Sequence, residues 1–181
     1  WKGSDTRSVF FDNMKIPSTN ILGNTQKGFN QFLETLTGGR ITIAALALGI
    51  SQGAYNLALN YSQEREAFGK KINKFQGVSF KLADMATQIE ATRHMVYNTA
   101  WLKDNNNSII KEAAMAKLFS SEVAMKITTE AIQIHGGYGY IREYNVERFF
   151  RDAKILEIGE GTSEVQRIVI SREILKSFNI Q

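Results

Sequence analysis

The sequence predicts an all-α protein: an antiparallel up-and-down helix bundle with a short β segment at its N-terminus. The single proline, Pro17, lies near the start, so the residues that follow permit long uninterrupted helices. Three stretches after residue 28 repeat apolar residues at helical spacing. The breaks between them are short polar or glycine-rich turns, and such turns join antiparallel neighbours in a bundle.

Composition and charge narrow the functional class. Hydrophobic residues make up 43% of the 181 residues and charged residues 22%, as in an ordinary globular domain with a substantial core. The sequence has no cysteine, which removes disulfides, thiolate zinc ligands and thiol nucleophiles and fits a reducing compartment. The charges that sum to +4 are interspersed, so nucleic acid is not an expected partner. We expect neither a signal peptide nor a membrane span, because no apolar run approaches ~20 residues.

Residues 8–16 contain β-favouring residues in partial alternation and are followed by turn residues. We expect a terminal strand or hairpin leg without its partners, and then a connector. Because the chain begins with Trp1 just before this strand, we also expect it to be a piece of a longer protein.

The first long helix is predicted from Gly28 to about Ser62. Residues 41–50 at its centre are almost entirely apolar, which predicts burial on most of its circumference. Gly38 and Gly39 lie inside this helix, where each costs about 1 kcal/mol relative to alanine. A plain kink is the default interpretation, and a packing or ligand-binding reason is the alternative.

Two further long helices follow. Residues 68–73 break the first helix, and Asn73 is the predicted cap of the second. The seam of the second helix has alternating steps of four and three: Val78, Leu82, Met85, Ile89, Thr92 and Val96. A polar turn at residues 104–108 offers Asp, Asn or Ser as the cap of a third helix, which ends at about His135 before a glycine-rich run. The seam of this helix contains small and hydroxyl residues that allow close helix approach: Ala114, Leu118, Ser121, Met125, Thr128 and Ile132.

Glu160 lies in a glycine-rich turn between a short helix and a last helix, which is predicted from Gly161 to about Phe178. The two flanking glycines leave its side chain uncrowded. Thr162 or Ser163 can cap the last helix, whose free N–H groups would then point back toward the carboxylate. A base beside such donors suits proton abstraction next to a carbonyl, and an ordinary solvated glutamate in a turn fits the same residues.

Other reactive groups are interpreted more simply. Glu90 and His94 share a helix face, but a di-iron bundle needs Glu-x-x-His on two helices. An ordinary salt bridge or a solvated pair is favoured, and no metal site is expected. Residues 136–140 follow a helix and lack the Gly-x-Gly-x-x-Gly pattern, which excludes a Rossmann loop. They are interpreted as a helix C-cap, with phosphate binding by backbone N–H groups as the alternative. Arg65 suits a helix C-terminus, and its planar guanidinium also matches pyrophosphate oxygens.

Several short motifs follow one another along the chain. They are Gly-Ser-Asp-Thr-Arg at 3–7, Pro17-x-x-Asn20-x-Leu22-Gly23, Gly39-Arg40-Ile41, Arg65-x-x-Phe68-Gly69 with Phe75-Gln76, Gln-Ile-His-Gly-Gly-Tyr-Gly-Tyr at 133–140, Arg-Asp-Ala-Lys at 151–154, and Glu-Gly-Thr-Ser-Glu-Val-Gln-Arg at 160–167. In this order and spacing they resemble the C-terminal half of the acyl-CoA dehydrogenases, which are FAD-dependent flavoenzymes. The resemblance covers practically the whole chain.

The resemblance implies that residues 1–24 are the tail of the family's middle β-domain with a connector, and that residues 25–181 are its C-terminal helical bundle domain. In the family, FAD lies between these domains and its ADP half reaches a neighbouring subunit. Arg65 and Gln76 match positions that cross over to the partner's FAD. The full set of positions that match FAD-contacting residues is Arg65, Phe68, Gln76, Gln133, Ile134, His135, Gly136, Gly137, Thr162, Ser163 and Glu164.

Glu160 matches the catalytic base of the family. Some branches carry the base immediately before the arginine that matches Arg40, and that position is Gly39 here, so the arrangement resembles short- and medium-chain members. Gly159 stands where straight-chain members often have tyrosine, so branched or unusual acyl groups stay possible. The positions that match the acyl-CoA site are Thr37, Arg40 and Gly161.

The implied reaction is the α,β-dehydrogenation of an acyl-CoA thioester to the trans-2-enoyl-CoA, as in fatty acid β-oxidation. Glu160 would remove the α-proton while the β-hydride passes to the flavin. The thioester oxygen would be held by the backbone N–H of Glu160 and a ribityl hydroxyl of FAD. Two alternatives stay open: an oligomerisation bundle without catalytic capacity, and an acyl-CoA oxidase that uses oxygen.

The resemblance also implies partners and a location. They are an acyl-CoA substrate, electron-transfer flavoprotein as acceptor, and further copies of the chain in a dimer of dimers. The expected location is the cytoplasm, or the mitochondrial matrix in a eukaryote. The isolated chain is expected to be inactive and colourless, because half of the flavin site lies outside it.

Overall fold

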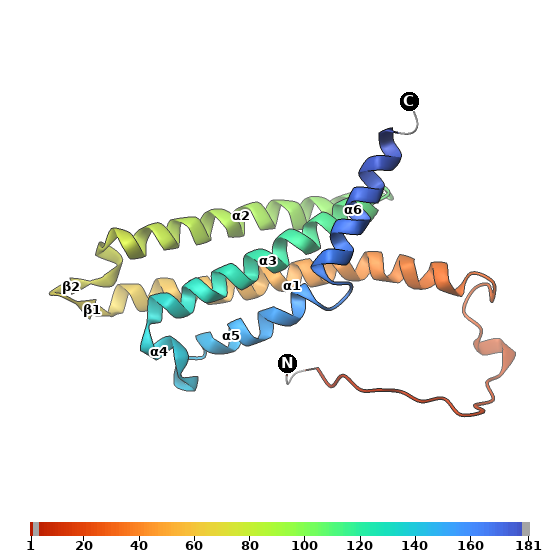
Figure 1. Ribbon diagram of the computed structural model, residues 1–181, viewed down its shortest axis with the longest axis horizontal. Coiled ribbons are helices and arrows are strands. Elements are labelled where there is room, and N and C mark those ends of the chain that lie inside the picture. Colours follow the sequence, from red (N-terminus) through yellow and green to blue (C-terminus); the bar gives the residue numbers. More distant parts are fainter. Residues whose placement is uncertain (2–3, 179–181) are drawn as a thin grey trace.

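The computed structural model describes residue 1 and residues 4–178 and confirms the all-α bundle. Three long helices lie side by side: α1 (Gly28–Glu64), α2 (Gln76–Asp104) and α3 (Ile110–His135), with α2 antiparallel to its two neighbours (Figure 1). The shorter α5 (Val146–Ala153) and the last helix α6 (Ser163–Phe178) pack on α3. The remaining elements are single turns: η1 (Ser18–Asn20), η2 (Ile72–Lys74), α4 (Gly137–Tyr140), η3 (Arg142–Tyr144) and η4 (Lys154–Glu157).

Helix α1 runs uninterrupted through Gly38 and Gly39. Burial on most of its circumference was expected, and this is wrong for its first turns, where Phe29 is 75% and Phe32 73% exposed. These turns project beyond the ends of α2 and α3, so no neighbouring helix covers them (Figure 1). Farther along, small residues such as Ala47, Ala54 and Ala58 are fully buried against the neighbouring helices.

By length and composition alone, α1 would also qualify as a membrane-crossing helix. Its most apolar window is 39% buried inside the bundle, and the core helix of a helical bundle has the same composition. Helix α1 packs along both α2 and α3, so part of its apolar centre lies in the bundle core.

A tight hairpin joins α1 to α2. Strand β1 (Glu66–Ala67) pairs antiparallel with β2 (Lys70–Lys71), with Glu66 opposite Lys71. The two loop residues, Phe68 and Gly69, have φ values of 49° and 79°. Positive φ at both positions is typical of a type I′ turn, whose twist matches that of the strands.

The second helix confirms its predicted seam, and both predicted caps are wrong. The N-cap residues are Phe75 for α2 and Ile109 for α3, and neither side chain caps its helix. Asn73 lies inside the η2 turn, two residues before Phe75, the N-cap residue of α2. In the polar turn, Asn107 Nδ2 donates instead to the Leu102 carbonyl at 3.2 Å, so the side chain satisfies the end of the preceding helix.

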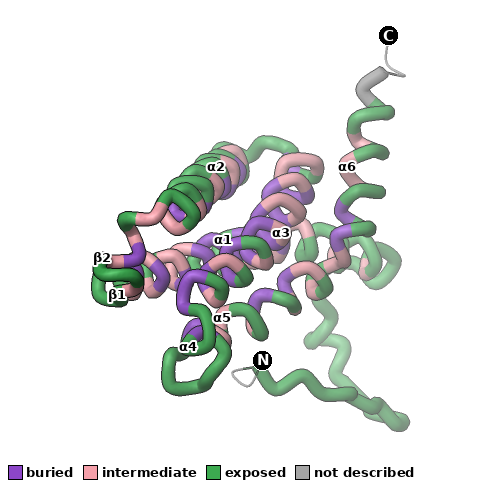
Figure 2. Tube along the Cα trace, turned by 60° about the vertical axis from the view of Figure 1, so that its left-hand side comes forward, coloured by how far each residue is buried: buried purple, intermediate pink, exposed green. Residues whose placement is uncertain are grey.

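Helix α3 is the central element, because α1, α2, α5 and α6 all pack against it (Figure 2). Burial therefore extends around the helix beyond the predicted seam, and Leu118 and Met125 of that seam are only half-buried. The fully buried positions are small or hydroxyl residues for the most part, including Ala113, Ala124 and Thr128. Their size allows the close approach of neighbouring helices that the sequence indicated.

The strand expected at residues 8–16 is not formed. This segment bends at residues 12–13, has no strand partner among the described residues, and lies apart from the helices (Figure 1). Its apolar side chains face solvent, and Phe10 is 91% exposed. A lone strand leaves its backbone N–H and C=O groups unpaired, which explains why its β-favouring residues do not produce a strand here.

Candidate active site

Glu160 occupies a backbone turn between η4 and α6 that is conformationally strained. Its φ is 56° and that of Gly161 is 91°, so two consecutive residues are left-handed. Glycine adopts this region freely, whereas a residue with a side chain pays about 1–2 kcal/mol. Backbone strain of this kind persists only where the surroundings hold it, and it concentrates at functional sites.

The surroundings that hold the turn are two buried side chains. Gln166 Nε2 donates to the carbonyls of Glu160 at 3.1 Å and Gly161 at 2.8 Å. Lys117 Nζ, from α3, donates to the same Gly161 carbonyl at 2.7 Å. Both side chains are fully buried. The sequence reasoning missed both residues, although a lysine among the small residues of a buried helix face was a signal.

Thr162 caps α6, as predicted, because its Oγ1 accepts from the backbone N–H of Val165 at 3.3 Å. The expectation that the free N–H groups of α6 would surround the Glu160 carboxylate is wrong. No described residue donates a hydrogen bond to this carboxylate, which extends across to α1 instead. The positive φ of Glu160 directs the side chain away from the helix that follows.

Gly39 makes room for this carboxylate. A methyl group built on Gly39 would lie 2.6 Å from Glu160 Oε2, closer than real contacts allow. The glycine inside α1 therefore has the packing reason that the sequence left open. It lets the carboxylate lie directly against the helix backbone.

A buried cation lies next to this carboxylate. Arg40 is 7% exposed, and its Nε has no hydrogen-bond partner among the described residues. Burial lowers the pKa of Arg40, and the negative charge of Glu160 partly offsets this. An orphaned guanidinium N–H beside an unpaired carboxylate leaves one donor and one acceptor available to a ligand.

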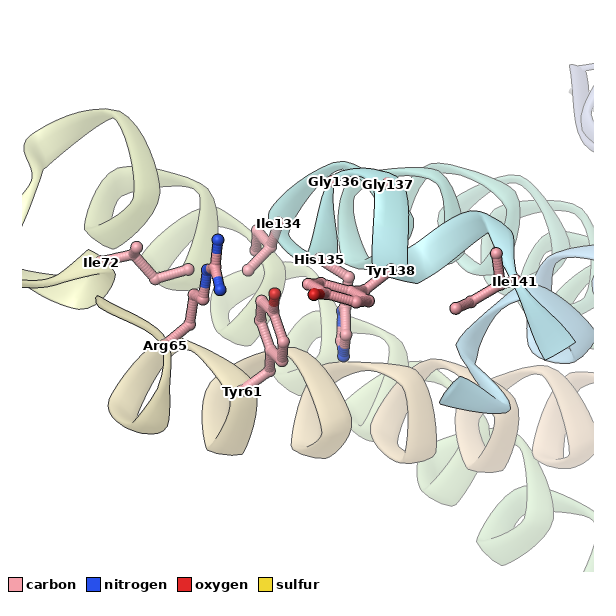
Figure 3. A pocket seen from close by; sticks show the side chains of 9 residues that line it. All are labelled: Tyr61, Arg65, Ile72, Ile134, His135, Gly136, Gly137, Tyr138 and Ile141. Atoms are coloured by element: carbon pink, nitrogen blue, oxygen red, sulfur yellow. The ribbon is translucent and has the colours of Figure 1, made fainter. Parts of the chain in front are cut away.

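A second site lies at the opposite end of α1 and α3. It is a pocket of about 500 Å³ (Figure 3). The residues around it come from the end of α1, from η2 and from the turn after α3: Tyr61, Arg65, Ile72, Ile134, His135, Gly136, Gly137, Tyr138 and Ile141.

Aromatic rings dominate this pocket. His135 stacks on Tyr61 with ring centroids 4.3 Å apart, and the Arg65 guanidinium lies 5.6 Å from the centre of the Tyr138 ring. Burial lowers the pKa of His135, so the imidazole is neutral near pH 7. Its Nδ1 donates to the Ala131 carbonyl at 2.8 Å, which leaves Nε2 as an acceptor.

The predicted site residues thus fall into two groups. Thr37, Arg40, Gly161 and Glu160 belong to the end where α6 begins, together with Thr162, Ser163 and Glu164, whereas the second pocket brings together Arg65, Ile134, His135, Gly136 and Gly137. Phe68, Gln76 and Gln133 are exposed and outside the residues that line this pocket. A helical rise of about 1.5 Å per residue separates Arg40 from Arg65 by about 40 Å, so one chain does not bring the two groups together.

The glutamate and histidine on α2 contact each other on the surface of the bundle. His94 Nε2 lies 3.5 Å from Glu90 Oε1. Both side chains are mostly exposed. No group of three or more metal-ligating side chains occurs among the described residues.

Comparison with known proteins identifies the family of this chain. Residues 26–175 match the family model of the acyl-CoA dehydrogenase C-terminal domain. The chain is 56% identical over 175 residues to the "Probable acyl-CoA dehydrogenase YngJ" of Bacillus subtilis, covering 97% of this chain and 46% of that protein. It is 50% identical over 177 residues to the mitochondrial short-chain specific acyl-CoA dehydrogenase of Homo sapiens, covering 98% of this chain and 43% of that protein.

A solved structure shows the same fold. Butyryl-CoA dehydrogenase from Megasphaera elsdenii superposes with a TM-score of 0.90 at 52% identity, over 91% of this chain and 43% of that chain. The chain thus spans less than half the length of these relatives. Fold, motifs and sequence identity lead to one conclusion: the chain belongs to the acyl-CoA dehydrogenase family.

Proposed function

We propose that this chain supplies the catalytic base for FAD-dependent α,β-dehydrogenation of acyl-CoA thioesters, and that the base is Glu160. The observation that carries the proposal is the Glu160 carboxylate itself. It is exposed, it receives no hydrogen bond from the described residues, and a strained turn holds it against Gly39. A carboxylate in this state is free to accept a proton from a ligand.

The residues present fit FAD at two places. The second pocket offers aromatic faces, the Arg65 guanidinium and a glycine backbone, which suit a nucleotide with its phosphates. Near Glu160, the buried Ser163 Oγ has no partner among the described residues and can bond to a cofactor. Bound FAD would supply the acceptor for the hydride that leaves the β-carbon.

The chain's own residues would remove the α-proton and stabilise the negative charge that develops on the substrate. Glu160 takes the α-proton onto a carboxylate oxygen, while its backbone N–H donates to the thioester oxygen as negative charge develops there. Arg40, buried beside it with an unpaired Nε, offers a further donor to the substrate. Thr37 and Gly161 would line the same site.

Two clusters about 40 Å apart support assembly from several copies. If each flavin contacts the Glu160 end of one chain and the Arg65 pocket of another, both clusters are used. We therefore propose a dimer of dimers in which Arg65, Phe68, Gln76 and Gln133 contact FAD bound mainly by a partner. The exposure of Phe68, at 96%, fits a residue that is covered by a partner.

The electron acceptor is proposed to be an electron-transfer flavoprotein. A relative from Acetobacterium woodii that is 47% identical is named as a subunit of a caffeyl-CoA reductase–Etf complex. We also propose a cytoplasmic location, or the mitochondrial matrix in a eukaryote, as the mitochondrial relative suggests. Oxygen reactivity of the reduced flavin would separate this function from that of an acyl-CoA oxidase.

The reverse direction is a second candidate function. A relative from Anaerotignum propionicum that is 47% identical is named acryloyl-CoA reductase (NADH). The same residues serve either direction, because a base that removes the α-proton returns it as an acid in the reverse reaction. Comparing the rates with butyryl-CoA and with crotonyl-CoA would show which direction the protein favours.

The test is Glu160→Gln in the full-length, FAD-loaded protein, with flavin bleaching followed anaerobically after butyryl-CoA is added. The amide cannot accept the proton, so we expect the rate of flavin reduction to fall by about 10²- to 10⁴-fold or more. Glu173→Gln is the matched control, because Glu173 pairs with Lys176 on the surface of α6 and its loss leaves the rate unchanged. Near-normal reduction in Glu160→Gln would exclude Glu160 as the base.

The oligomerisation alternative has its own test. A bundle that only assembles would leave the full-length protein without flavin after purification. We expect the full-length protein to be yellow and to bleach with substrate, and the 181-residue chain alone to be colourless. A colourless full-length protein that still assembles would favour the oligomerisation function.

A further inference from the structure

Lys117 is the one fully buried lysine in the part of the chain that the structure describes. It lies on the central helix α3, among alanines and serines that pack against neighbouring helices. Burial lowers the pKa of Lys117, Glu157 raises it, Arg40 lowers it, and Glu160 and Glu164 raise it. The ammonium lies against the Glu160 turn, because Lys117 Nζ is 2.7 Å from the Gly161 carbonyl oxygen.

Burying an ammonium group costs the free energy of its hydration. An apolar side chain of the same length would fill this site without losing hydration, and replacing buried charges by apolar residues often stabilises a protein. The packing of α3 therefore does not explain the lysine. Its polar contact does: Lys117 Nζ donates to the carbonyl of Gly161, the residue that follows Glu160.

Gln166 completes the arrangement from the other side. Its Nε2 donates to the carbonyls of both Glu160 and Gly161. The Gly161 carbonyl thus receives two donors, which uses both of its lone pairs. One donor comes from α3 and the other from α6, so the left-handed pair of residues is tied to two rigid helices at once.

We propose that Lys117 and Gln166 act as a buried clamp on the carbonyls of Glu160 and Gly161, which keeps this turn left-handed and aims the Glu160 carboxylate at the substrate. Both are positioning residues, because neither side chain faces the space where a substrate would meet Glu160. The inference rests on the proposed function for its catalytic consequence. The clamp itself is a property of the chain's own residues.

The test is Lys117→Met in the FAD-loaded full-length protein, which keeps the apolar stem and removes the ammonium. We expect the limiting rate of flavin reduction by butyryl-CoA to fall by about 10- to 100-fold, because a misplaced reacting group costs that much. The half-saturating substrate concentration should change by less than about threefold, because substrate binding does not require proton transfer. Lys126→Met is the matched control, since Lys126 is exposed on the same helix, and it should change neither quantity.

A second measurement does not depend on catalysis. The backbone amides of Val165 and Gln166 donate to Thr162 at the end of the turn, so their hydrogen exchange reports its local opening. We expect Lys117→Met to accelerate this exchange at least about tenfold, because hydrogen bonds to charged groups are the stronger ones. Lys126→Met should leave it unchanged.

Gln166→Leu keeps the proposal testable if Lys117→Met does not fold, because it removes the other half of the clamp. Both effects should appear again, and the double variant should lose less than the product of the single losses, since both donors share the Gly161 carbonyl.

The possible outcomes distinguish failure of the clamp proposal from failure of the proposed function. Faster exchange together with a slower limiting rate supports the clamp. Faster exchange at a normal rate overturns the positioning role, and a slower rate with unchanged exchange overturns the clamp. If the normal protein is not reduced by any acyl-CoA, the proposed function fails, and the exchange result still decides whether Lys117 holds the turn.

Discussion

The two ends of the bundle are built in opposite ways. At the Glu160 end, charged side chains gather around a strained turn, and the Glu160 carboxylate has no hydrogen-bond partner among the described residues. At the Arg65 end, stacked rings and a glycine loop surround a neutral, hydrogen-bonded histidine. The first arrangement leaves a carboxylate available to a ligand, whereas the second offers flat ring surfaces on which a bound ring can stack. One helix, α1, carries both, about 40 Å apart.

The largest expected effect comes from a substitution that crowds the Glu160 carboxylate. In Gly39→Ala, the added methyl group would meet Glu160 Oε2 at 2.6 Å, so the carboxylate must move. We expect the limiting rate of flavin reduction to fall by about tenfold or more, since catalysis is sensitive to small misplacements. Stopped-flow flavin bleaching measures it. An unchanged rate would mean that the carboxylate is free to find another productive position.

The pocket end should respond to pH through His135. Burial holds the pKa of His135 below its ordinary value of 6.5. The unfolded chain therefore binds more protons than the folded one as pH falls below about 6.5, and stability decreases there with a slope of at most about 1.4 kcal/mol per pH unit. Above this range the imidazole is neutral in both states, so the contribution of His135 to stability is constant.

His135→Phe keeps the stacked ring and removes the titrating group. We expect the thermal midpoint of this variant to fall less steeply between pH 7 and pH 5 than that of the normal protein. His94→Gln is the control, because the His94 side chain is 81% exposed, and its slope should match the normal one. Equal slopes in His135→Phe and the normal protein would contradict the burial of a neutral imidazole.

The smallest expected effect is that of Gly49→Ala, which serves as a contrast with Gly39→Ala. Gly49 lies on the same helix, and nothing lies within 4 Å of a methyl group built on it. Gly49→Ala should therefore raise stability by about 0.5–1 kcal/mol through helix propensity alone, without changing the rate. Thermal unfolding and flavin bleaching measure the two quantities. A loss of rate in Gly49→Ala would show that α1 itself, rather than its contact with Glu160, controls the reaction.

Local patterns predicted most of the secondary structure. The helices α1, α2 and α3, the seam of α2, the Thr162 cap and the Glu160 turn follow from periodicity and turn residues. The N-caps of α2 and α3 were not predicted correctly, because Asn107 bonds to the preceding helix and Asn73 is part of the η2 turn. Residues 8–16 have strand propensity, and no strand forms there because propensity cannot supply a partner strand.

The sequence by itself determined the family and the helical architecture, because motif order, helical periodicity and the position of the one proline are local features of the sequence. Only the tertiary structure decided how Glu160 is presented. The Gly39 contact and the buried Arg40 come from α1 and the Lys117 donor comes from α3, both far from the turn in sequence, and Gln166 adds a donor from the start of α6. Helix packing brings them to one turn, and a strained backbone is stable only where such distant groups meet around it.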